Sequence, residues 1–147
     1  MTGENVFENI FNKNKIVAVI VRNDYQKEGI SFFTPSYFSQ QLAYMKHPVG
    51  KVIQPHVHNE VKREVFFTNE VLFIKKGKLR VDFYDDEKVY FESKILGTGD
   101  VILLASGGHG FEVLEPVEMI EVKQGPYAGD QDKTRFDGID ISAVVIR

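Results

Sequence analysis

The segment Gly50–Gly77, GKVIQPHVHNEVKREVFFTNEVLFIKKG, decides the predicted fold. His56 and His58 stand two residues apart among β-branched residues, and this composition predicts a strand over 51–58. Alternate side chains of a strand point to the same face, so both imidazoles would converge on one point. Glu70 heads a second strand-like run, VLFIKKG, twelve positions after His58.

A third histidine follows in a glycine-rich stretch farther along the chain. The stretch GTGDVILLASGGHG delivers His109. Three neutral imidazoles and one carboxylate form a ligand set suited to a divalent transition metal. The sequence therefore predicts a metal site built from His56, His58, Glu70 and His109, and the donor types suit iron, manganese, nickel, cobalt or zinc equally.

The spacing of these residues resembles the first motif of the cupin family, G-x5-H-x-H-x(3–4)-E-x6-G. Gly50 is followed by five residues and then by the His56–His58 pair. Glu70 is followed by six residues and then by Gly77. Between these halves, Asn59–Asn69 replaces the usual three or four residues with eleven.

The second cupin motif, G-x5-P-x-G-x2-H-x3-N, is matched in part. Five residues follow Gly99, and Ala105 then stands in place of the proline. One residue is missing before His109, and Val113 replaces the asparagine. The resemblance covers about 40–125.

This resemblance implies an all-β fold, a small double-stranded β-helix or jelly-roll-like barrel with the metal inside. A chain of 147 residues suggests a single domain over 1–147. Within it, the barrel would lie between an N-terminal helix and strand extension, 1–35, and a C-terminal tail, 124–147. Many small cupins are homodimers, and the resemblance implies the same here.

Two other glutamates compete with Glu70 for the place of the carboxylate ligand. Glu60 and Glu64 lie nearer the histidines along the chain. Glu60 follows His58 by only two positions, and Val71 rather than glycine stands seven positions after Glu64. The pattern therefore favours Glu70.

The rest of the chain reads as one helix followed by many short strands. Apolar residues at Val6, Phe7, Ile10 and Phe11 predict a short amphipathic helix that Thr2 could cap. The run IVAVIV, apolar on both faces, predicts a buried strand. Further strands are predicted over these segments: 41–47, 51–58, 70–75, 78–84, 89–93, 101–105, 111–115, 117–123 and 139–146. Gly77 and Pro116 would each separate two of them.

Composition narrows the classes of partner and the compartment. The net charge of −3 comes without a basic cluster, so no nucleic-acid surface is expected. The longest apolar run is far shorter than the roughly 18 residues of a membrane span, and the start lacks the cationic region of a signal peptide. The absence of cysteine fits a reducing, cytoplasmic location.

The function expected from the resemblance is that of a metal-dependent enzyme acting on a small oxygen-rich molecule. Dioxygenases and sugar or keto-acid isomerases both fit, and in the isomerase Glu70 or a nearby base would move the proton. The alternative is a non-catalytic cupin that binds a small ligand. A metal-free epimerase type is disfavoured because such cupins lack a full ligand set.

Three residues are candidates for contacting the substrate. Gln54 would share a strand face with His58. Arg63 and Arg135 could grip an anionic group. The long insertion Asn59–Asn69 is predicted to form a lid or a dimer contact at the barrel mouth.

Overall fold

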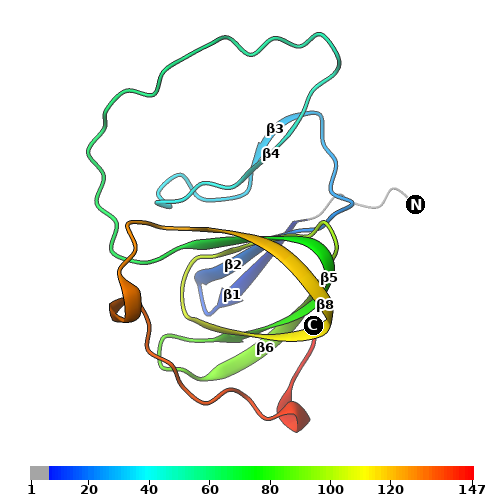
Figure 1. Cartoon of the computed structure of the whole chain (residues 1–147), viewed down its shortest axis with the longest axis vertical. Coiled ribbons are helices and arrows are strands. Elements are labelled where there is room, and N and C mark those ends of the chain that lie inside the picture. Colours follow the sequence, from blue (N-terminus) through cyan, green and yellow to red (C-terminus); the bar gives the residue numbers. More distant parts are fainter. Residues whose placement is uncertain (1–6) are drawn as a thin grey trace.

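The computed structural model describes residues 7–147, which are organised almost entirely as β-structure (Figure 1). The strands in chain order are β1 (Phe7–Asn12), β2 (Lys15–Val21), β3 (Gly29–Phe32), β4 (Ala43–Lys46), β5 (Glu70–Tyr84), β6 (Tyr90–Gly97), β7 (Val101–Leu104) and β8 (Gly108–Lys123). Two short 3-10 turns follow, η1 (Gly129–Asp132) and η2 (Ile141–Ala143), and no α-helix occurs in the described chain. The all-β prediction is confirmed.

The predicted N-terminal helix is wrong, because its residues form β1. This strand pairs antiparallel with β2, with Phe7 opposite Val21 and Ile10 opposite Ala18. Ile10 enters the core, whereas Phe7 packs on the other side of the sheet against Phe33. Burial on two faces therefore overrides a pattern that suits a helix. Val6 and the proposed capping residue Thr2 lie outside the described residues.

A curled antiparallel sheet, in the order β1-β2-β7-β5-β6, forms a half-barrel, and β8 pairs with β5 along its other edge. The strand predicted at 16–21 is confirmed as β2, which is buried between β1 and β7. The half-barrel encloses an apolar core to which β1, β2, β5, β6 and β7 all contribute. The core residues are Ile10, Val17, Ala18, Ile20, Leu72, Ile74, Leu79, Val81, Phe83, Leu96, Ile102 and Leu104.

The hairpin of β3 and β4 covers the outer face of this sheet. Tyr25 and Phe33 are buried there against Val19, Val21 and Leu103. Their rings contact each other edge-on, with centroids 5.0 Å apart. This packing fixes the hairpin on the outside of the half-barrel, and the chain leaves it at the end of β4.

The two longest strands, β5 and β8, run unbroken through points where the sequence predicts breaks. Gly77 and Pro116 are internal bends instead, and the register between the strands shifts nearby. Gly77 has a φ of 96°. A Cβ there would lie 2.1 Å from the Pro116 carbonyl oxygen, so only glycine permits this approach of the two backbones.

Residues 47–69 form an arm between β4 and β5 that arches away from the barrel and returns to it at Thr68 and Asn69 (Figure 1). The strand predicted over 51–58 is absent, because this segment has no neighbouring strand with which to pair. Near the start of the arm, the Lys51 amide donates a local backbone hydrogen bond to the Pro48 carbonyl. A β-rich composition supports a strand only where an edge is within reach.

The C-terminal tail wraps the outer face of β5 and β6. The strand predicted over 139–146 is reduced to η2 and a single parallel bridge between Ser93 and Ile146. Beneath the tail, Arg80 and Asp82 form a buried bidentate ion pair of 2.8 and 3.0 Å. The Ser93 hydroxyl donates a further hydrogen bond of 2.5 Å to the same carboxylate.

Candidate functional site

Glu70 is the first residue of β5 and lies at the end of the barrel core. It shares the inward face with Leu72 and Ile74, both of which are buried. Leu104 of β7 stands opposite it on one side and Lys123 of β8 on the other. The carboxylate is therefore held between two neighbouring strands, with only 8% of its side chain exposed.

Two basic side chains of β8 meet this carboxylate. His109 Nε2 lies 3.3 Å from Glu70 Oε2, and Lys123 Nζ lies 3.2 Å from Oε1. The hydrogen bond from His109 is the main cause that lowers the pKa of Glu70 from 4.5 to about 2, burial opposes it, and the bond from Lys123 adds to it. Glu70 is therefore ionised at any pH near neutrality.

His109 presents its second ring nitrogen to the open side of the site. It lies on β8 opposite Phe83, and its ring packs against Phe111 with centroids 5.3 Å apart. Because Nε2 is directed at Glu70, Nδ1 is the atom left for a ligand or a proton. This nitrogen has no hydrogen-bond partner among the described residues.

A cavity of about 1310 Å³ opens at this end of the half-barrel. Its wall combines Glu70 and His109 with aromatic side chains, notably Phe38, Tyr84 and Phe136. An apolar wall with a few polar groups is typical of small-molecule sites. A smaller cavity of about 230 Å³ adjoins it and shares the end of the arm and Arg135 as lining.

The two remaining predicted ligands lie on the arm, away from this cavity. His56 and His58 are exposed, and their rings contact each other with centroids 5.2 Å apart. His56 Nδ1 donates to the Gln54 carbonyl over 2.9 Å, which in the neutral ring leaves Nε2 as a free acceptor. A bond of this kind also orients histidines that ligate metals.

The structure thus unites two of the four predicted metal ligands and separates the other two. The donor types suit a transition metal, but residues 7–147 contain no group of three or more His, Asp or Glu side chains that could hold one. The single chain, with its arm in this position, does not offer a complete site. Completion requires the arm residues to reach the cavity.

The rival carboxylates and two substrate candidates also lie on the arm. Glu60 is exposed, and Glu64 lies 4.0 Å from Lys62 at the cavity edge. Gln54 and Arg63 are exposed and make only local contacts, the latter to the Val61 carbonyl. None of these residues contacts Glu70 in this arrangement.

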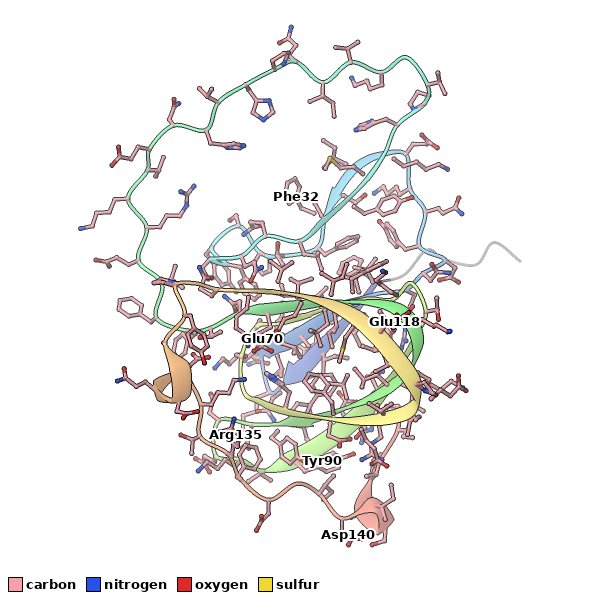
Figure 2. All side chains as sticks on the ribbon, in the orientation of Figure 1. Phe32, Glu70, Tyr90, Glu118, Arg135 and Asp140 are labelled. Carbon is pink, nitrogen blue, oxygen red and sulfur yellow. The ribbon has the colours of Figure 1, made fainter. Side chains whose placement is uncertain are left out.

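Arg135 is the substrate candidate that the structure places at the cavity. It lies on the C-terminal segment, on the same side of the barrel as Glu70 (Figure 2). Its guanidinium is largely exposed, 3.9 Å from Asp130. The side chain is therefore available to an anionic group entering the cavity.

Sequence reasoning missed Lys123 and Tyr84. Lys123 closes the charged cluster around Glu70, and only the long pairing of β5 with β8 reveals it. Tyr84 lines the cavity and accepts a hydrogen bond from the Ile139 amide over 2.8 Å. Its contact with Phe136 follows from the path of the tail, which no local pattern encodes.

Comparison with known proteins assigns no family to this chain. No protein-family model matches it, and neither a curated protein nor a solved structure does so. Separately, residues 7–147 include no helix whose length and hydrophobicity would suffice to cross a membrane. Inferences about function therefore depend on the geometry of the cavity and on the motif spacing.

Proposed function

We propose that the cavity binds a small oxygen-rich molecule and that the Glu70–His109 pair moves a proton on it. The observation that carries this proposal is the 3.3 Å contact between the two side chains at the wall of a large cavity. A carboxylate that orients an imidazole is a recurrent arrangement for general acid–base catalysis. Sugars and keto acids, which isomerise by proton transfer, are the substrate class that this chemistry suits.

Within the pair, His109 is the better candidate for the general base. A carboxyl with a pKa of about 2 is a weak base near neutral pH, because lysine and histidine stabilise its charge. His109 keeps Nδ1 directed away from Glu70 and free to accept a proton. Glu70 then acts by orienting the ring and by stabilising the imidazolium that forms.

Two basic side chains at the cavity offer a place for an anionic group of the substrate, beside acidic lining residues such as Asp86, Glu121 and Asp132. Lys133 and Arg135 line its mouth, and Arg135 is largely exposed. Apolar contacts from Phe38 and Phe136 would pack against the carbon skeleton. A phosphorylated sugar or a carboxylated ketone combines these properties.

A divalent metal held by His56, His58, Glu70 and His109 is a second form of the proposal, based on the cupin resemblance, in which His109 would be a ligand in place of the base. The His56 tautomer, with Nε2 free, supports a ligating role. Because the ligands are divided between the arm and the cavity, this part of the proposal requires that the arm move or that a second chain supply it.

Proton transfer can be tested without knowing the natural substrate. The protein is incubated in D2O with a panel of keto acids and sugar phosphates, and exchange of C–H protons is followed by NMR. We expect exchange of at least one compound, and we expect His109→Gln to abolish it. His47→Gln is the matched control, because His47 lies outside the cavity lining.

Exchange that persists in His109→Gln would refute the role of this histidine. A panel that binds, shown by a raised melting temperature, but never exchanges would favour the non-catalytic ligand-binding alternative.

A further inference from the structure

The inner face of β8 is uncovered although it belongs to the barrel core. Phe111 and Val113 stand opposite Val81 and Leu79, which are fully buried core residues. Residues directly opposite in a sheet point to the same face. Yet Phe111 is 41% exposed and Val113 is 55% exposed. The inward side chains of β5 are therefore buried, whereas those of β8 are exposed to solvent.

The outer edge of β8 is also unpaired. This strand pairs with β5 on one side, and none of the described residues forms a ladder on its other side. The edge of β6, in contrast, is capped by the C-terminal tail through hydrogen bonds between Ser93 and Val145. A long unpaired edge can accept another strand.

The arm has the composition of a strand but pairs with no sheet. Val52, Ile53 and Val57 are exposed, Val57 to 85%. Its segment 51–58 is extended and β-rich, and Pro55 removes one amide donor. A proline of this kind is tolerated in an edge strand, where one side of the backbone needs no partner. The composition of segment 51–58 and its unpaired backbone therefore suit it to pair with part of the free edge of β8.

No acidic residue of segment 51–58 would face the glutamates of β8, three of which already pair with basic residues of the same chain. Segment 51–58 carries Lys51 and no acidic residue. Four glutamates lie on β8 against one lysine, and these are Glu112, Glu115, Glu118 and Glu121. The full arm, 47–69, also falls within the roughly 20–30 residues that each partner contributes to a standard interface.

We propose that two copies of the chain exchange arms, so that segment 51–58 of each adds as a strand to the free edge of β8 in the other. A second copy is favoured over closure onto the same barrel by the hairpin of β3 and β4. That hairpin is anchored on the outer face by Tyr25 and Phe33 and holds the start of the arm there (Figure 1). Its outward residues Ile30, Phe32 and Met45 are exposed, and Figure 2 shows Phe32 away from the barrel.

Exchange gives segment 51–58 a neighbouring strand and covers the free edge of β8. The contact is reciprocal, as a two-fold dimer requires. In segment 51–58, Val52, Gln54, His56 and His58 share one face. With this face inward, the exchange delivers the partner's His56 and the partner's His58 toward Glu70 and His109.

The absence of cysteine makes the exchange directly testable. Val52→Cys, on the inward face of the segment, and Val113→Cys are prepared as separate proteins with different tags, unfolded together, refolded and oxidised. We expect a disulfide-linked heterodimer that contains one copy of each. The matched control pairs Val113→Cys with Val89→Cys. Val89 is also an exposed valine (57%), but it lies in the turn between β5 and β6, so no cross-link is expected.

Two further measurements make each outcome decisive. Light scattering should give twice the chain mass of 16.8 kDa for the unmodified protein, and a monomer across the concentration range would overturn the proposal. The double variant Val52→Cys/Val113→Cys should form covalent dimers, whereas an exclusively intrachain disulfide would show that the arm closes on its own barrel and would also overturn it.

Val52→Cys with Phe111→Cys serves as a second pair if the first reduces folding, which circular dichroism reports. These readouts do not involve metal or activity. The exchange can therefore fail while the proposed proton transfer holds, and the reverse is equally observable.

Discussion

Glu70 and His109 touch at 3.3 Å although they lie near the starts of different strands, β5 and β8, and are 39 positions apart in the chain. In the β5–β8 ladder they lie at opposite ends, with Phe83 opposite His109 at one end and Glu70 opposite Lys123 at the other, and the curl of the two strands brings these ends together. Two bent strands thereby place an acid, an imidazole and an ammonium group at one cavity. This relationship leads to measurable consequences for pH dependence.

Acid should destabilise the protein through Glu70. Its folded pKa of about 2 lies below the ordinary value of 4.5, so its contribution to stability is complete above pH 4.5 and is lost as the pH falls toward 2. A difference of this size corresponds to at most about 3 kcal/mol. Urea unfolding of the native protein and of Glu70→Gln at several pH values measures it.

The variant should show a flatter dependence of its free energy of unfolding on pH in that window. Equal slopes for both proteins between pH 4.5 and 2 would mean that the ion pairs of Glu70 contribute nothing in solution.

Metal retention should depend on both halves of the divided ligand set. Protein purified without added metal should contain close to one equivalent of a transition metal by elemental analysis, and His58→Ala and His109→Ala should each lose it. Free metal at a hundredfold excess over its dissociation constant should add about 2.7 kcal/mol of stability. His47→Ala, the remaining histidine, should retain the metal.

An unmodified protein that contains no metal, and whose melting temperature does not respond to added iron, manganese, nickel, cobalt or zinc, would remove metal from the proposed function. The proton-transfer experiment would be unaffected.

The buried Arg80–Asp82 pair should behave differently when one partner or both are replaced. Asp82→Ala leaves a buried guanidinium with only Glu112 nearby, so we expect a loss of about 3–5 kcal/mol. Replacing both with leucine should recover most of that loss, because no buried charge is then left unpaired. Chemical denaturation of the three proteins measures the difference.

An exposed ion pair supplies the comparison. Lys15 and Asp86 lie 2.9 Å apart with both side chains mostly in water, and Asp86→Ala should cost less than about 1 kcal/mol. A loss for Asp82→Ala no larger than this would contradict the structural role of the buried pair.

Gly77→Ala should bend or loosen the β5–β8 pair. The new methyl group would meet the Pro116 carbonyl at 2.1 Å, and the positive φ disfavours any L-residue, so we expect a loss of about 1–3 kcal/mol or more. Gly97→Ala is the control, because it has open space around its Cβ position. Thermal unfolding should leave the control near the native protein; similar losses in both would argue against the close approach.

Much of the barrel could be predicted from sequence, because buried strands such as β2 are apolar on both faces. The prediction of an N-terminal helix was wrong because Ile10 packs in the barrel core while Phe7 packs against Phe33 on the opposite face of the sheet. A local pattern does not reveal these two packing surfaces. Gly77 and Pro116 suggest strand ends in the sequence, but in the structure they lie at bends of β5 and β8 that face each other across the ladder.

The candidate site was predicted in part for a similar reason. Glu70 and His109 come together because both face inward and the curl of β5 and β8 brings the two ends of their ladder together. The position of His56 and His58 depends on what the arm contacts, and the spacing of residues within one chain carries no information about a contact with another. Whether these histidines join the site stays a prediction.

The bent strand β5 is hydrogen-bonded along both edges, by β7 and then β6 on one side and by β8 on the other. Its amides should therefore be the last to exchange with deuterium, while those of the arm exchange at once. The β8 ladder also joins segments far apart in the chain, Glu70 with Lys123 among them. Folding must close such long loops before the ladder gains stability, so this barrel should fold slowly for its size.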